Sequence, residues 1–415
     1  MKILDKCCKW MAPVALSVFL AACGGGGEEA PAAPIASVEP TVPTVPVIVT
    51  GSSTGVLTDT AVGGVSYTTS SGVTGTTAAD GSYQFNPGDT VTFKLGGLTL
   101  GTVTATGIIT PMELSGGSAV KLQNLLVLLQ SLDSDGNPAN GINIPAAAAA
   151  AVAASVNLGG ATATFATDAG VQAAMTAGGI GGVPRTIAAA NAHFLSQGLA
   201  MLSGNIWVDQ SVDSGGQTHT FVLRVDATGN YVQIETGPDE LQGDTVVAYS
   251  GVEVGTLTVA GFSPDGFNLS ATTSTDSNGQ WGASNLQACD RLRNTGDQLV
   301  NIDCESSRRS FSKMQNVASS IVGGWLVTYQ EGSVTNAMET YYFANGTWVS
   351  TGYTVNCVGG CPSEAHYGTW TIANGLLTTV EGGQTSRPVT YRLSADGMTL
   401  TLDGNTSFAQ TRISK

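Results

Sequence analysis

The sequence predicts a mainly β protein, with an α+β module on its N-terminal side and two antiparallel β-barrels after it. Three observations predict this fold class. Short runs rich in Val, Thr, Tyr and Phe alternate with Gly and Asp-Gly turns over much of the chain, which is typical of short antiparallel strands. Leucines spaced three and four residues apart mark one amphipathic helix. The C-terminal half repeats a string of Trp, Gly and aromatic positions, which predicts two related domains in tandem.

Residues 1–22 have the layout of a secretion signal, with three lysines before an apolar stretch at 11–22. That stretch is shorter than the roughly 20 apolar residues that a membrane-spanning helix needs. It ends in Leu20-Ala-Ala-Cys23, which resembles the lipobox of bacterial lipoproteins. The resemblance implies cleavage before Cys23 and acylation (palmitate or a related chain) of its thiol. By resemblance to enterobacterial lipoprotein sorting, the glycine that follows Cys23 favours the outer membrane, and the membrane face stays open.

Residues 23–50 are predicted to form a lipid anchor and a stalk. The segment is dominated by Gly, Pro, Ala, Glu and Val, and Pro-rich chains are extended and build no packed core. Two or more acyl chains hold a protein stably on a bilayer. The sequence therefore predicts a protein that is anchored to the membrane and does not span it.

Residues 51–201 are predicted to form a small β-sandwich followed by helices. Thr77-Ala-Ala-Asp80-Gly81-Ser-Tyr83-Gln-Phe85 places a tight turn before two aromatic residues that share one strand face. This stretch resembles the hairpin of carboxypeptidase-regulatory-like and collagen-adhesin B-type domains, which implies a spacer or display module. Helices are predicted over the leucine-rich stretch 120–132, after Pro145, and from residue 185 to 201.

A loop after the first helix carries oxygen ligands at alternate positions. Asp133, Asp135, Asn137 and Asn140 surround a glycine and resemble the first half of a calcium loop. The position at which an EF-hand loop has its bidentate Glu is Ile144. The alternative is a helix C-terminus and turn, in which Asp and Asn bind free backbone groups. A structural calcium ion is the one cofactor that the sequence suggests.

Residues 202–318 and 319–415 are predicted to be the two barrels. Gly204-Asn-Ile-Trp207 begins the first copy and Gly323-Gly-Trp325 the second, and the next aromatic landmark follows 24 and 23 residues later. The order of Gly-Trp, aromatic and Gly-x-Trp strands is similar to lipocalin-like domains of bacterial lipoproteins. That resemblance implies an early tryptophan across the floor of an eight-stranded barrel.

A cup for a small apolar ligand is one interpretation of such a barrel. The aromatic side chains expected to line it are Trp348, Tyr353, Trp370 and Tyr391. The alternative is a solid core, because an eight-stranded barrel is only just wide enough to hold one small ligand.

Four cysteines remain after the lipobox, and outside the cytoplasm an even number favours disulfides. Three pairings are open, and the sequence-local one is favoured, with Cys289 bonded to Cys304 and Cys357 bonded to Cys361. The rival interpretation, a metal or redox site, lacks a second pair or a histidine at tetrahedral spacing.

Composition and motifs limit the function. Charged residues make up 11% of the chain and the net charge is -15, which argues against binding to nucleic acid because phosphates need clustered Lys and Arg. The histidines His193, His219 and His366 fall in separate segments without a catalytic motif. We therefore expect a non-enzymatic cell-envelope lipoprotein that acts in surface display, adhesion or contact with an envelope or host macromolecule. The alternatives are a carrier of a small apolar ligand, or a hydrolase whose residues converge only in the fold.

Overall fold

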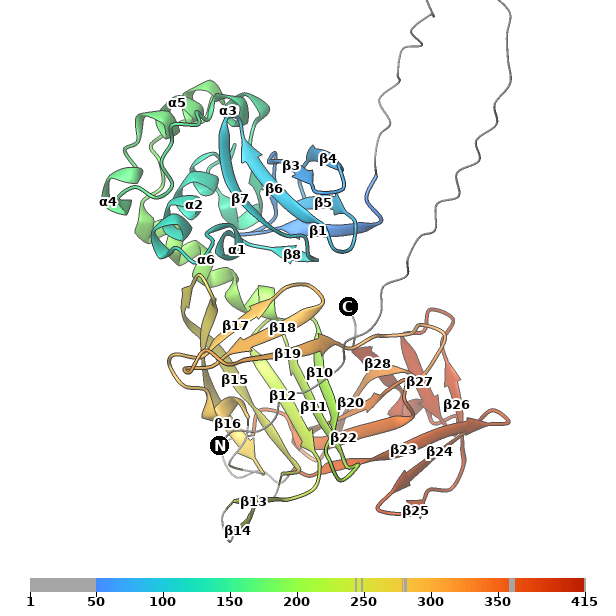
Figure 1. Cartoon of the computed structure of the whole chain (residues 1–415). Coiled ribbons are helices and arrows are strands. Elements are labelled where there is room, and N and C mark those ends of the chain that lie inside the picture. The colour runs from blue at the N-terminus through green and yellow to red at the C-terminus, as the bar shows by residue number, and fades with distance from the viewer. Residues whose placement is uncertain are drawn as a thin grey trace, which may run out of the picture. The chain divides into compact units, whose positions relative to one another are not determined.

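A computed structural model describes residues 50–242, 245–247, 249–277, 279, 282–357 and 363–413 (Figure 1). Cys23, the signal, the stalk up to residue 49 and Cys361 lie outside the described residues. The structure confirms the fold class, with an N-terminal α+β module and two eight-stranded antiparallel barrels. None of the helices in the described ranges is long and apolar enough to cross a membrane.

The strands of the N-terminal module form two small sheets and one additional pair. One sheet has the order β5-β1-β8, the other has the order β4-β3-β6-β7, and β2 pairs with β9. Their bounds are β1 (Ser53–Leu57), β2 (Val62–Gly63), β3 (Ser66–Thr69), β4 (Thr74–Thr76), β5 (Ser82–Phe85), β6 (Thr90–Leu95), β7 (Leu98–Thr104), β8 (Ile108–Ile109) and β9 (Ile142–Asn143). The ring of Tyr83 in the first sheet lies 5.7 Å from that of Tyr67 and 5.3 Å from that of Phe93 in the second. These edge-on contacts close the sandwich.

The hairpin that the sequence predicts is present. Oδ1 of Asp80 accepts the Ser82 N–H at 2.9 Å, and Gly81 has φ of 77°, a conformation that glycine adopts without steric cost. Tyr83 and Phe85 are both buried, as their shared strand face requires.

The three predicted helices are confirmed as α2, α3 and α6. The helices are α1 (Pro111–Leu114), α2 (Ala119–Ser131), the short 3-10 turn η1 (Pro138–Asn140), α3 (Ala146–Ala151), α4 (Thr162–Phe165), α5 (Ala169–Ala177) and α6 (Ile187–Leu202). Ser118 caps α2 by accepting the Lys121 N–H, and Thr186 caps α6 in the same way. Helix α5 has no leucine periodicity and was not predicted. It begins at the cap Asp168, which is the one local signal for it.

The first barrel follows α6 directly. Its ring order is β10-β11-β12-β15-β16-β17-β18-β19, with β10 (Ile206–Val212), β11 (Thr218–Val225), β12 (Asn230–Thr236), β15 (Gly251–Ser263), β16 (Gly266–Asp276), β17 (Arg291–Asn294), β18 (Gln298–Ile302) and β19 (Arg308–Lys313). A small hairpin, β13 (Glu240–Gln242) and β14 (Thr245–Val247), and the 3-10 turn η2 (Ala283–Asn285) lie in its connections. Phe194 of α6 contacts Phe262 and Phe267 of this barrel, so helix and barrel share one core.

The second barrel closes through a pairing between β23 and β24. Its strands are β20 (Gly323–Glu331), β21 (Val334–Tyr342), β22 (Thr347–Thr354), β23 (Ala365–Ala373), β24 (Leu376–Glu381), β25 (Gln384–Thr385), β26 (Val389–Leu393), β27 (Thr399–Leu402) and β28 (Gln410–Ile413), with a 3-10 turn η3 (Thr406–Phe408). In the described residues the ring is β23-β22-β21-β20-β28-β27-β26-β24, and β25 is added at its edge.

The first and last strands pair in the same way in the two barrels. In each, the early tryptophan is fully buried and pairs in register with a basic residue of the last strand: Trp207 with Lys313, and Trp325 with Arg412. The Arg412 guanidinium lies 4.2 Å from the centre of the Trp325 ring, a favourable cation–π distance. The shared position supports the sequence repeat at Gly-Asn-Ile-Trp and Gly-Gly-Trp.

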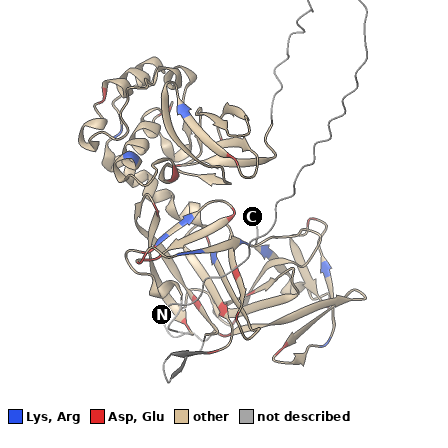
Figure 2. Cartoon of the chain, in the orientation of Figure 1, with Lys and Arg blue, Asp and Glu red and all other residues tan. Residues whose placement is uncertain are grey.

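A buried ion pair joins the barrels. Nε of Arg224 on β11 lies 3.0 and 3.1 Å from the two carboxylate oxygens of Glu339 on β21. The hydroxyls of Tyr341 and Tyr353 donate to the same carboxylate. Glu339 is completely buried. Charged residues are sparse along the described part of the ribbon (Figure 2). Apolar side chains of both barrels surround the pair, so the contact is a packed interface.

We expect Glu339→Gln to lower the free energy of unfolding by about 3 kcal/mol, because it leaves the Arg224 guanidinium buried without a counter-charge. Urea unfolding followed by tryptophan fluorescence measures the change. Asp403→Asn is the matched control, because its partner Arg387 is exposed and exposed pairs contribute about 1 kcal/mol or less. Equal losses in the two variants would contradict the buried role of the pair.

Candidate ligand cavity

The first barrel encloses a cavity because its inward-facing positions carry mostly aliphatic residues. Side chains alternate between the two faces of a strand, and on β11 Phe221, Leu223 and Val225 point inward while Val222 and Arg224 point outward. The register with β12 sets Phe221 opposite Glu235 and Leu223 opposite Gln233. Residues 221–223 are all apolar, so barrel closure and not the sequence shows which face is inside.

The cavity has a volume of about 190 Å³. It is lined by wall strands, by Leu202 at the end of α6 and by the connection between β16 and β17. The lining residues are Leu202, Phe221, Leu223, Val225, Gln233, Glu235, Leu257, Leu269, Gly282, Ala283, Leu286, Leu292, Leu299, Asn301, Arg309 and Phe311.

The two ends of the cavity differ in polarity. Near α6 the lining is aliphatic, and Leu202 and Leu292 are both buried. At the other end, the register brings Asn301 opposite Arg309, two positions beyond the apolar pair Leu299 and Phe311. The cavity therefore has an apolar end and a polar end.

Arg309 marks the polar end. Its guanidinium carbon lies 5.5 Å from the ring centre of Phe221 and 5.0 Å from that of Phe311, and its Nη2 lies 2.9 Å from Oδ2 of Asp209. Half of the Arg309 side chain is exposed, so this end is accessible from solvent. Two aromatic faces and a carboxylate hold the cation in place.

A buried carboxylate fixes the connection between β16 and β17, which lines part of the cavity. Oε1 of Glu253 accepts the Ser284 N–H at 2.7 Å, and Oε2 accepts the Ser284 hydroxyl at 3.0 Å. Tyr231 also donates to it. Burial raises the pKa of Glu253 despite these bonds. Gly282 has φ of 112°, and a Cβ there would lie 2.2 Å from Oε2 of Glu253, so this close approach requires glycine.

Cys289 and Cys304 form a disulfide with their Cα atoms 5.1 Å apart. This is the first of the two sequence-local pairings. The bond ties the β16–β17 connection, which supplies Ala283 and Leu286 to the cavity, to the turn between β18 and β19. The second predicted bridge, from Cys357 to Cys361, depends on a residue outside the described ranges.

The aromatic residues predicted to bind a ligand do not form one set. Trp348, Trp370 and Tyr391 lie in one cluster with Trp325 inside the second barrel, where they fill space around Leu377 and Leu400. Tyr353 lies on the opposite face of β22, packed towards the first barrel. It is five residues from Trp348, and an odd separation along a strand puts two side chains on opposite faces.

The predicted calcium ligands bind one another and the backbone. Oδ1 of Asp133 accepts the Asn143 N–H at 3.0 Å, and Oδ1 of Asp135 accepts the Asn137 N–H at 2.9 Å. Oδ2 of Asp135 accepts an N–H of the Asn140 amide at 2.9 Å. In the described part of the chain, no cluster of three His, Cys, Asp or Glu side chains is arranged for a metal ion. These contacts account for the turn, and calcium stays a prediction.

His193 lies in a buried polar cluster that sequence reasoning did not detect. Its Nε2 is 3.7 Å from Oδ1 of Asp59, and Oδ2 of Asp59 accepts an N–H of Gln130 at 2.8 Å. Burial raises the pKa of Asp59 to about 7, and burial with the Arg185 charge lowers the pKa of His193. His219 and His366 lie elsewhere, beside Asp213 and Glu381, so the three histidines share no site.

The fold and the cavity define a chain of tandem β-barrels, of which the first holds an internal cavity with one polar end. A scan of protein-family models and a search of curated proteins both find no match to this chain. Functional inference therefore depends on the site itself.

We expect Asp59 to make stability depend on pH. Burial raises the pKa of Asp59 from 3.8 to about 7. The contribution of the neutral carboxyl to folding stability is therefore fully present below pH 3.8 and is lost as the pH rises to about 7. Asp59→Asn keeps a neutral group, so the variant should gain stability relative to the parent over this range.

Thermal unfolding of both proteins from about pH 4 to about pH 8 measures that difference. Asp80→Asn is the control, because the pKa of the exposed Asp80 is lowered by hydrogen bonds from Ser82 and its difference should be flat from about pH 5 upward. A flat difference for Asp59→Asn would contradict the buried neutral carboxyl.

Proposed function

We propose that the protein is a cell-envelope lipoprotein whose first barrel binds a small, mostly apolar molecule with one polar group. The observation that carries the proposal is the cavity with an aliphatic end beside α6 and a polar end at Arg309, Asn301 and Glu235. A ligand would bury its hydrocarbon part against leucines and keep its polar group near hydrogen-bonding side chains. This arrangement is common in small-molecule sites.

The size of the cavity limits the ligand. A dry cavity of about 150 Å³ lined by aliphatic and aromatic residues binds benzene, and drug-sized ligands need about 300 Å³ or more. A volume of about 190 Å³ therefore suits a single ring or a short alkyl chain. Long lipid chains exceed this volume.

The second barrel serves as a packed partner in this proposal. Trp325, Trp348, Tyr342 and Leu400 form its buried cluster, and the Arg224–Glu339 pair fastens it to the first barrel. Binding rather than catalysis is proposed, since the polar lining residues of the cavity in the described chain are Gln233, Glu235, Asn301 and Arg309, a set that holds no Ser or Cys nucleophile.

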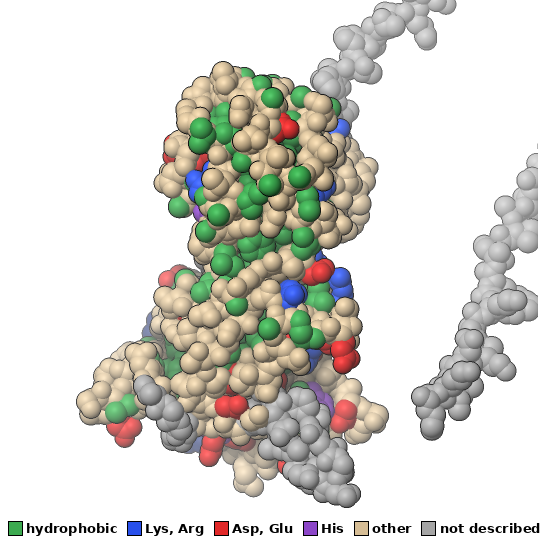
Figure 3. All heavy atoms as spheres, turned by 90° about the vertical axis from the view of Figure 1, so that its left-hand side faces the viewer, with side chains coloured by type: hydrophobic (Ala, Val, Ile, Leu, Met, Phe, Trp, Pro, Cys, Tyr) green, Lys and Arg blue, Asp and Glu red, His purple; other side chains and the backbone are tan. Residues whose placement is uncertain are grey.

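A lipid anchor at Cys23 would hold this binding unit at the outer membrane, which makes it a retained carrier or sensor and not a diffusing one. Scattered hydrophobic side chains on the face shown in Figure 3 are interrupted by polar surface, which is normal for a folded unit in water. Display or adhesion remains the rival role, and a failure of ligand binding would favour it.

We expect linear alcohols from 1-butanol to 1-octanol to bind the protein with rising affinity. Each added methylene buries apolar surface and should tighten binding about fourfold until the chain outgrows the cavity, after which affinity should stop rising. Isothermal titration calorimetry measures the series.

Leu299→Trp should remove this binding, since Leu299 faces the cavity, whereas Gln298→Trp, on the exposed outer face of the same strand, should leave it unchanged. Leu269→Phe is a second filling variant if the first folds poorly. Absence of binding in the parent, or equal binding in the filled variants, would sink the carrier proposal.

We expect Cys23→Ser to abolish acylation and processing at the lipobox. Intact-mass spectrometry of the envelope fraction should show an acylated chain that begins at residue 23 in the parent and an unacylated chain in the variant. Cys289→Ser is the matched control and should keep the acyl mass. The anchor proposal fails if the parent carries no acyl mass.

A further inference from the structure

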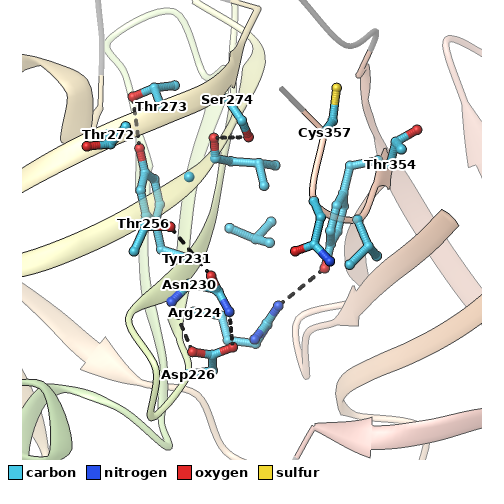
Figure 4. A pocket seen from close by; sticks show the side chains of 16 residues that line it. Arg224, Asp226, Asn230, Tyr231, Thr256, Thr272, Thr273, Ser274, Thr354 and Cys357 are labelled. Carbon is cyan, nitrogen blue, oxygen red and sulfur yellow. Dashed lines mark hydrogen bonds between the residues drawn. The ribbon is translucent and has the colours of Figure 1, made fainter. Parts of the chain in front are cut away.

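A second hollow lies on the outside of the first barrel, where it faces the second barrel (Figure 4). This inter-barrel groove has a volume of about 390 Å³, within the range of small-molecule sites. Strands β12, β15 and β16 form one wall, and the end of β22 with residues 355–357 forms the other. It is separate from the lumen cavity, because the two share no lining residue.

The strand register arranges the first wall in two rows. Asn230 is opposite Thr256, and Thr256 is opposite Thr272, which makes a polar row across three neighbouring strands. Beside it, Val232 is opposite Val254, which makes an apolar row. A hydrogen-bonding strip therefore runs parallel to an apolar strip.

The second wall repeats this mixture. Tyr353 offers a ring and Val355 an aliphatic side chain, while Asn356 adds a polar side chain. Asn356 has φ of 58°, a left-handed conformation that asparagine tolerates better than most residues. Figure 4 shows the labelled side chains of the first wall on one side and Thr354 and Cys357 on the other, with Arg224 between them.

The charges at the groove are already compensated. Arg224 is bound by both oxygens of Glu339. The Asp226 carboxylate accepts N–H groups of Thr228 and Asn230 within its own turn. Among the described lining residues there is no lysine and no cation without a carboxylate partner. An anionic ligand such as a phosphate would find no free positive charge.

We propose that the inter-barrel groove binds a neutral saccharide. A sugar ring has hydroxyls along its edge and C–H groups on its faces. The hydroxyls of Thr256 and Thr272 match the hydroxyl edge, and the row of Val232 and Val254 matches the C–H face. This site goes beyond the proposed carrier function and does not depend on it.

The test is calorimetric titration of the full-length mature protein with cellobiose, maltose and N,N′-diacetylchitobiose at millimolar concentrations. At least one disaccharide should bind. Thr256→Val combined with Thr272→Val keeps side-chain shape and removes two hydroxyls, and should weaken binding about tenfold, which corresponds to about 1.4 kcal/mol. Asn356→Gly removes a polar side chain of the second wall but permits the same backbone conformation. This variant should also weaken binding.

The matched control is Thr258→Val combined with Ser270→Ala. Thr258 is opposite Ser270 on the same strands and the same outer face, two positions beyond the groove, so this variant should bind as the parent does. Binding of 1-hexanol in the lumen should be unchanged in all three variants, which separates this proposal from the carrier proposal. No binding of any disaccharide, or binding that both groove variants leave unchanged, would overturn the saccharide site.

Discussion

The alternation of side chains along a strand is the constraint on which both barrels depend, although two register shifts interrupt it between β15 and β16. In a closed eight-stranded barrel every position faces either the lumen or the outside, so a slip of one residue would exchange the two sets. On β11 the lumen receives Phe221, Leu223 and Val225, while the outside receives Val222 and Arg224. The same parity creates the lumen cavity, the apolar contact between the barrels and the ion pair within that contact.

The two barrels have the same number of strands but differ in how their interiors are filled. Each has a buried tryptophan opposite a basic residue of the last strand, yet the second is filled by a cluster that includes Trp325, Trp348 and Tyr342. In the first barrel, aliphatic residues and a connection fastened by the Cys289–Cys304 bond leave space. Binding capacity in such a fold is a property of side-chain volume and not of strand order.

Three buried acidic side chains lie where different elements of the fold meet. Glu339 lies between the barrels with three donor groups, from Arg224, Tyr341 and Tyr353. Glu253 holds the β16–β17 connection through Ser284. Asp59 lies between α2 and α6 beside Gln130 and His193. Burying each of these groups costs desolvation free energy. In each case the partner side chains come from different elements. The interaction therefore favours one arrangement of those elements over others.

The sequence by itself determined features that depend on neighbours along the chain. The Asp80-Gly81 turn, the leucine helix α2 and the Trp207 and Trp325 repeat follow from local spacing, which also favoured the Cys289–Cys304 pair among three open pairings. The tertiary structure decided which face of each strand is enclosed and which barrel is hollow, and it placed Tyr353 away from Trp348. It also brought Arg309 to the mouth of the cavity and Asp59 to His193. These outcomes depend on how each barrel closes and on the summed volume of side chains from eight strands. A short stretch of sequence carries neither kind of information.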